Sequence, residues 1–180
     1  MLLKKLRQIM KVKIKLSQES IDEARKKIND YNTALKRKTT DLISRLGDEG
    51  YSCVAKRLQE IHWTGELASS LSYTLNGNTA IISVDSEHAI FVEFGTGVVG
   101  SKNGHPSIDG FNYSYATGQC IGWYNVNGQV KFGWYYYNPE LDRLVFTEGM
   151  EARPFMYESS LELRYEKMNR IVKEIFNDRS

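Results

Sequence analysis

The chain has 180 residues and a mass of 20.7 kDa, a length that fits one domain. Hydrophobic residues make up 41% of it and charged residues 26%, as in ordinary globular proteins, and no apolar run approaches the ~18 residues of a membrane span. The formal net charge of +2 conceals a division: residues 1–40 hold 12 basic and 4 acidic side chains, whereas residues 41–180 hold 12 and 18.

The first residues are basic without an unbroken apolar stretch, so we do not expect a secretory signal. Lys11–Leu16 alternates Lys with branched apolar residues, a pattern of period two that predicts an edge strand. Ser17 suits a helix N-cap, and the apolar residues that follow at spacings of three and four predict an amphipathic helix of roughly 28 residues. This stripe consists of Ile21, Ala24, Ile28, Tyr31, Leu35, Leu42 and Leu46. We expect Gly47 and Gly50 to end that helix and a second, short helix to follow over residues 51–61.

From about residue 65 the pattern indicates β-structure. Leu67–Leu75 is rich in Ser and Thr and leads into Asn76-Gly77-Asn78, a strong hairpin signal, with Thr79–Val84 as the return strand. Ala89–Phe94 is a third apolar run that we expect to be a strand stopped by Gly95-Thr96-Gly97. A polar loop is expected from Val98 to Gln119, and a loop of that length is usually functional or disordered.

An aromatic hairpin is predicted next, with strands at 121–124 and 130–137 around a turn at 125–129, followed by a strand at 144–146. Arg153-Pro154-Phe155 opens a final helix that runs nearly to the C-terminus, since proline is tolerated in a first helical turn. Strands grouped between helices predict an α+β fold with a mainly antiparallel sheet. We expect a single domain over residues 1–180, in which 1–47 form a basic strand and long helix and 98–147 form a loop and aromatic hairpin insert.

The titratable residues form no recognisable catalytic or metal-binding motif. His62, His88 and His105 lack the local spacing of a metal site, and Cys53 and Cys120 are too far apart in sequence for a local metal clip and too few for a disulfide scaffold. Gly-rich phosphate-binding patterns are absent. We therefore expect neither an enzyme nor a bound cofactor or metal.

The aromatic hairpin offers another kind of site. Consecutive strand residues face opposite sides of a sheet, so the tyrosines at 135, 136 and 137 cannot all be in a core. Exposed aromatic area indicates a protein interface or a flat ligand such as a sugar ring. A twisted ribbon stiffened by cross-strand aromatic pairs is the purely structural alternative.

Three segments in this order resemble one family. They are Thr64-Gly65-Glu66-Leu67-Ala68-Ser69-Ser70-Leu71, His88-Ala89-Ile90-Phe91-Val92-Glu93-Phe94-Gly95-Thr96-Gly97 and Glu148-Gly149-Met150-Glu151-Ala152-Arg153-Pro154-Phe155-Met156. Together they are similar to the head–tail joining, or tail-completion, proteins of long-tailed bacteriophages, the gene-product-ten-like minor tail components. The resemblance covers roughly residues 60–175. The insert with its aromatic hairpin is similar to the version in phages and prophages of Gram-positive bacteria.

The resemblance implies a structural neck protein of the virion, made in the bacterial cytoplasm. Members form homo-oligomeric rings, typically of six subunits, between the portal and head-completion adaptor ring and the tail terminator or tail tube. No membrane is involved, and the basic segment 1–40 would face either DNA in the lumen or an acidic neighbouring ring. Candidate ring-interface residues are Glu93, Gly95, Thr96, Gly97, Arg153, Pro154, Phe155, Trp134 and Tyr136.

Each of these residues has an expected role. Glu93, a charge on an apolar strand, would pair across a subunit boundary or block edge aggregation, and Arg153 would clamp a carboxylate, Glu93 among the candidates. Gly95 and Gly97 would permit positive φ at a sharp corner, and Phe155 would anchor the last helix. A purely intramolecular role is the alternative for each. The alternative function is a cell-wall or carbohydrate-binding module that uses the aromatic hairpin, although such hairpins usually occur in tandem copies.

Overall fold

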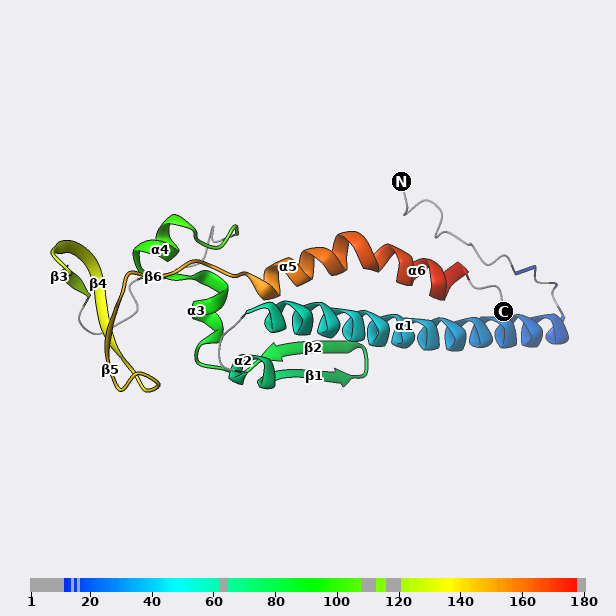
Figure 1. The fold of residues 1–180 in the computed structure, drawn as a ribbon. Helices are drawn as coiled ribbons and strands as arrows, with labels where there is room; N and C mark the ends of the chain where they lie inside the picture. Colours follow the sequence, from blue (N-terminus) through cyan, green and yellow to red (C-terminus); the bar gives the residue numbers. More distant parts are fainter. Residues whose placement is uncertain are drawn as a thin grey trace.

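The computed structural model describes residues 12–13, 15, 17–61, 65–107, 113–115 and 121–177. The molecule is elongated (Figure 1): a long helix lies between the C-terminal helices on one side and a β-hairpin on the other, and a second sheet lies at one end. The helices are α1 (Gln18–Glu60), α2 (Glu66–Ser69), α3 (Ala89–Phe94), α4 (Gly97–Lys102), α5 (Phe155–Glu162), a π-helical turn (Leu163–Lys167) and α6 (Met168–Asn177). The strands are β1 (Leu71–Asn76), β2 (Thr79–Val84), β3 (Gly122–Val126), β4 (Gln129–Asn138), β5 (Arg143–Thr147) and β6 (Gly149–Met150).

Helix α1 is one continuous helix of 43 residues, so the prediction that Gly47 and Gly50 break it is wrong. Ser17 caps it as predicted, its side chain accepting the N–H of Ser20 at 3.4 Å. Both glycines are buried inside the helix, where a methyl group on Gly47 would lie 2.5 Å from the hydroxyl oxygen of Tyr73. The glycines therefore serve the close approach of the β1–β2 hairpin, and that packing outweighs the helix cost of about 1 kcal/mol for each glycine.

The main core is built around the C-terminal half of α1. Its buried members come from four elements and one helix end: Val54, Leu58, Ile61, Leu67, Val92 and Phe155. Side chains of β1, β2 and α5 pack against this cluster. The apolar stripe predicted from Ile21 to Leu46 is therefore only partly buried: Ala24 is buried, and Ile28, Tyr31 and Leu35 stay exposed. The other buried residues of α1 lie beyond that stripe, between Gly47 and Leu58.

The β1–β2 hairpin forms with the predicted turn, and Tyr73 pairs with Ile82 in its register. Three local predictions are corrected. Residues 67–69, expected to open the first strand, lie in the short helix α2, and 97–102, expected to be loop, form α4. Ala89–Phe94, expected to be a strand, is helix α3, because a short apolar run fits a buried helix as well as a strand.

Strands β3, β4 and β5 form a three-stranded antiparallel sheet in sequence order, which confirms the aromatic hairpin and the strand after it. Asn127 and Gly128 have φ values of +53° and +79°, as the tight turn of such a hairpin requires. The α+β class with antiparallel strands is confirmed, but the strands divide into two sheets that lie apart along the molecule (Figure 1).

The final helix begins at Phe155, directly after Pro154, and continues through the π-helical turn to Asn177. The strand predicted at Lys11–Leu16 falls largely outside the described residues, and the described Val12, Lys13 and Lys15 are not in a strand. Among the described helices, none is both long and apolar enough to cross a membrane.

Candidate functional site

The second and third segments that carry the family resemblance meet in space. Thr96 and Gly97 form antiparallel bridges to Met150 and Gly149, and the Met150 N–H donates to the Thr96 hydroxyl at 3.2 Å. The Arg153 N–H donates to the Val92 carbonyl at 2.7 Å. We call residues 92–97 and 149–157 together the junction. It links the helical body to the chain that enters the three-stranded sheet (Figure 1).

Glu93 lies at the centre of the junction and is buried. Its two carboxylate oxygens accept the backbone N–H groups of Met156 and Tyr157, each at 2.9 Å. These groups belong to the first turn of α5, whose N-cap position is Pro154, a residue without a side-chain acceptor. Glu93 therefore supplies, from α3, the cap and the negative charge that a helix N-terminus favours.

His105 completes the surroundings of this carboxylate. Its Nε2 lies 3.3 Å from Glu93 Oε1, while its Nδ1 accepts the N–H of Ser107 at 3.0 Å. The acceptor role of Nδ1 places a ring proton on Nε2, the nitrogen that faces Glu93. The ring packs against Phe94 and Tyr157, with centroids 4.7 and 4.9 Å away. Glu93 thus has donors on both oxygens from its own chain, and it lies on a helix rather than on the expected strand edge.

Two glycines of the junction have backbone angles that favour glycine, as predicted, although Gly95 ends helix α3 and not a strand, and Gly97 begins helix α4. Gly95 has φ +80° and Gly97 has φ +63°. A methyl group on Gly95 would lie 2.7 Å from the Ala152 nitrogen. Both the angle and the close approach of residues 148–152 exclude larger side chains here.

The segment from Arg153 to Phe155 contains one buried and one exposed candidate residue. Phe155 is 3% exposed and belongs to the main core, which confirms its anchoring role. The Arg153 side chain is exposed, and among the described residues it makes no ion pair with Glu93, whose partners are His105 and the start of α5. Any carboxylate that Arg153 clamps lies elsewhere.

The aromatic sheet has two distinct faces. The register places Tyr124, Tyr135 and Phe146 on one face, with ring centroids 5.3 to 6.0 Å apart. Trp134 and Tyr136 share the other face with Phe132. A shallow cavity of about 220 Å³ separates that face from α4 and is lined by Gly97, Val98, Ser101, Tyr115, Ile121, Phe132, Gly133 and Trp134. The consecutive tyrosines 135–137 are all exposed, which agrees with the prediction that they cannot all lie in a core.

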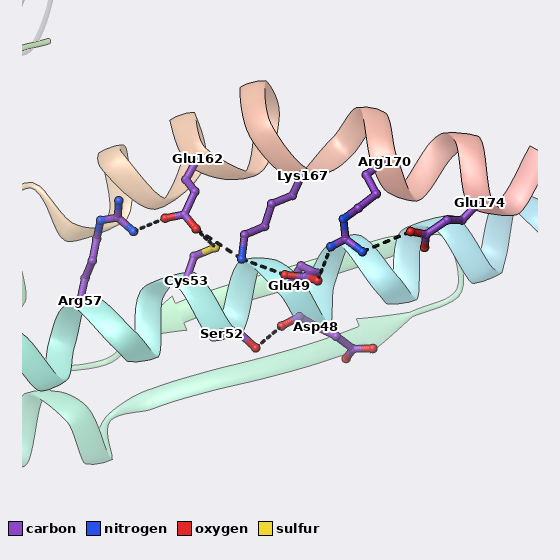
Figure 2. A network of polar contacts seen from close by, with 9 residues as sticks. All are labelled: Asp48, Glu49, Ser52, Cys53, Arg57, Glu162, Lys167, Arg170 and Glu174. Carbon is purple, nitrogen blue, oxygen red and sulfur yellow. Dashed lines mark hydrogen bonds and ion pairs between the residues drawn. The ribbon is translucent and has the colours of Figure 1, made fainter.

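A network of charged side chains joins α1 to the C-terminal helices (Figure 2). Glu162 accepts from Arg57 Nη1 at 2.7 Å and also contacts Lys167 and the Cys53 thiol. The Arg57 hydrogen bond lowers the pKa of Glu162 to about 2, while burial raises the pKa of the Cys53 thiol. Glu49, which precedes Cys53 by four residues on α1, forms ion pairs with Lys167 and Arg170, each at 2.9 Å.

This network was not anticipated from the sequence, although a signal is present. Glu49, Cys53 and Arg57 are four residues apart and so share one helix face, as do Glu158 and Glu162 on α5. Complementary charges on two such faces predict a contact only once the two helices are known to be neighbours.

Within the described residues, no group of three or more His, Cys, Asp or Glu side chains is placed to hold a metal ion. His62 and Cys120 lie outside the described residues. A scan against protein-family models and searches of curated proteins and of solved structures found no match to this chain.

Proposed function

We propose that this chain is a structural bacteriophage protein that forms a homo-oligomeric ring, typically of six subunits, and joins the tail to the head. Its neighbours would be the portal and adaptor ring on one side and the tail terminator or tube on the other. The observation that carries the proposal is the junction. The two segments most characteristic of the resemblance, about 55 residues apart in sequence, hold one another through the Glu93 cap and the Thr96–Met150 bridge.

The chemistry of the junction fits a positioning role. Glu93 has donors on both oxygens, and Gly95 and Gly97 bring the two segments into close backbone contact. Such an arrangement fixes how the sheet is held on the helical body. A ring requires this, because each subunit must present two different surfaces at a constant angle to its neighbours.

The shape of the chain also supports a ring subunit. The molecule is elongated, with the aromatic sheet at one end and the first half of α1 at the other (Figure 1). Both ends expose large apolar side chains. Exposed apolar surface at two opposite ends favours assembly with other chains.

Deletion of the coding sequence from its native phage or prophage genome tests this proposal. Negative-stain electron microscopy of the induced lysate should show filled heads and finished tails that are not joined. Normal joined particles would contradict the joining role. Expression of the chain from a plasmid during induction is the control that restores joining.

A cell-wall or carbohydrate-binding role is the second candidate, favoured by one observation. Trp123 is 72% exposed on β3, as expected of a ring that stacks on a sugar. Sedimentation of the purified chain with bacterial cell walls distinguishes the two: the carbohydrate role predicts binding that Trp123→Ala abolishes, whereas the joining role predicts that the chain stays in the supernatant.

A further inference from the structure

Strand β1 has an outer edge with no partner among the described residues. The β1–β2 sheet has only these two strands in the described part of the chain, so each strand is paired on one side only. Ile82 of β2 and Leu163 both lie against Gly50, where a methyl group would be 2.7 and 3.3 Å from their side chains. Strand β2 is therefore on the side of the C-terminal helices, and the unpaired edge of β1 is on the side away from them (Figure 1).

This edge lacks the features that normally protect the edge of a sheet. Residues 71–84 contain no Lys, Arg, Asp, Glu or Pro, and the six residue pairs of the hairpin follow one another without a bulge. Edge strands usually carry a charge, a proline or a bulge that prevents another strand from pairing. Leu75 of β1 and Tyr51, whose ring lies 6.3 Å from that of Tyr73, are also 42% and 37% exposed beside this edge. The edge of β1 is therefore open to a further strand.

The segment Lys11–Leu16 has the sequence pattern of a strand that fits this edge. Its three lysines alternate with three branched apolar residues, and β1 has the same period, with polar residues that alternate with Leu71, Tyr73 and Leu75. The described residues of the segment are not in a strand within the single chain. Paired with β1, the segment would extend the apolar face that packs on α1 and would leave its lysines on the solvent side.

Length excludes pairing of this segment with β1 of its own chain. Six extended residues span about 20 Å, and the segment is attached directly to Ser17 at the start of α1. The Tyr73 hydroxyl donates to the Ser44 carbonyl at 3.4 Å, so β1 lies beside a part of α1 that is 27 residues beyond Ser17. The helical rise makes that separation about 40 Å, twice what the segment can span. The segment can therefore reach β1 only in a second copy of the chain.

Charge favours the same pairing. The segment Lys11–Leu16 has three lysines and no acidic residue, so two such segments repel one another. Residues 65–94, which include the hairpin, contain no Lys or Arg, and Glu66, Asp85 and Glu87 near the base of the hairpin are exposed. The hairpin therefore presents an acidic surrounding to a basic strand.

We propose that Lys11–Leu16 of one subunit adds to the edge of β1 in a second copy of this chain and makes a three-stranded sheet shared by two subunits. The inference deepens the proposed ring and rests on it, since it names the contact between neighbouring subunits. The donor segment precedes α1, whereas the acceptor edge lies beside the second half of α1. The contact is therefore heterologous, and each subunit both donates and accepts a strand. Backbone hydrogen bonds along the strand give the affinity, and the alternating side chains decide which face turns inward.

Disulfide trapping between single-cysteine variants of the full chain tests this contact. Thr74→Cys on β1 is mixed with one donor variant at a time, in a Cys120→Ser background with the buried Cys53 kept. The donor variants are Lys11→Cys, Lys13→Cys and Lys15→Cys. Whenever the apolar residues of the segment face α1 and most of it is paired, one of these lysines lies opposite Thr74. After mild oxidation, at least one mixture should give about tenfold more covalent dimer than either variant alone, because a disulfide requires Cα atoms within about 7 Å. Circular dichroism checks that each variant stays folded.

Ile81→Cys is the matched control for Thr74→Cys. Ile81 pairs with Thr74 across the hairpin and is also exposed, but it lies one strand further from the proposed edge, so it should give no dimer with the donor variants above that of each variant alone. Cross-links of the donor variants to Ile81→Cys in place of Thr74→Cys, or equal dimer yields from Thr74→Cys alone, would show a different pairing and overturn the inference. Oligomers by light scattering without the mixed cross-link would overturn it while the joining role stands. Monomers without any cross-link would also overturn it, and the joining role is then decided by the lysate microscopy.

Discussion

The carboxylate of Glu93 accepts the N–H of Met156 at 2.9 Å, although 63 residues separate them in sequence. The same carboxylate also accepts a hydrogen bond from the N–H of Tyr157. Helix α5 is preceded by Pro154, which offers no capping side chain, so its start depends on a residue of α3. This single side chain therefore ties the segment before the sheet to the segment after it.

Removal of that cap should destabilise the whole fold. Glu93→Ala leaves two N–H groups of α5 without acceptors and removes the carboxylate that lies 3.3 Å from His105 Nε2, and we expect the free energy of unfolding to fall by about 2–4 kcal/mol. Urea denaturation measures this. The exposed Glu151→Ala is the matched control and should change stability by less than about 0.5 kcal/mol. Equal stability of the two variants would contradict the capping role.

Truncation of Phe155 tests the anchor of α5 in the core. The side chain is almost fully buried beside Val92 and Leu58, so Phe155→Ala should cost about 3–5 kcal/mol through lost burial and the cavity left behind. Thermal unfolding is the measurement. A midpoint within a degree of the parent value would show that this ring is not a core residue.

The close contact between Gly47 and Tyr73 predicts that Gly47→Ala changes the free energy of unfolding in opposite directions with and without the Tyr73 side chain. Gly47→Ala should destabilise the parent chain by about 1–2 kcal/mol, because the new methyl group meets the Tyr73 ring. In a Tyr73→Ala background the same change should stabilise by up to about 1 kcal/mol, since alanine favours helix. A double-mutant cycle by urea unfolding checks this, and additive effects would disprove the close approach.

The charged network predicts a specific acid sensitivity. The folded pKa of Glu162 is about 2 against an ordinary 4.5, so the stability it adds is complete above pH 4.5 and is lost as the pH falls towards 2. Glu162→Gln should cost about 1–2 kcal/mol at pH 7 after allowance for its 21% exposed side chain, and much less at pH 2. Unfolding titrations at several pH values measure the difference. Glu158→Gln, at a site 53% exposed, is the control and should differ little at any pH.

Arg153 should matter for assembly and not for folding. Its side chain is exposed and makes no ion pair among the described residues, so Arg153→Ala should leave the free energy of unfolding within about 0.5 kcal/mol. We expect the same variant to lose head–tail joining when it replaces the parent chain. Arg164→Ala, also exposed, is the control and should join normally. Unimpaired joining by Arg153→Ala would remove this residue from the ring interface.

Much of the fold is predictable because its signals are local. The helix cap at Ser17 and both hairpin turns depend on residues close in sequence. The errors arise where packing decides. Gly47 resembles a helix breaker until Tyr73 is seen against it, and the short apolar run at 89–94 fits a strand or a buried helix equally well.

The candidate site was only partly predictable for the same reason. The glycine positions at 95 and 97 and the buried Phe155 follow from residue type. The role of Glu93 does not, because its partners are backbone N–H groups 63 and 64 residues away and a histidine from an expected loop. No residue pattern identifies a carboxylate that caps a distant helix.

Joining of separated heads and tails in vitro tests the central claim most directly. Heads and tails from the deletion lysate are mixed with the purified chain, and infectious particles are counted against its concentration. We expect the titre to rise with dose by several orders of magnitude. Tyr165→Ala, a change at an exposed side chain of the π-helical turn, is the control and should support the same rise. Heads and tails that stay separate in the presence of folded, soluble protein would contradict the account.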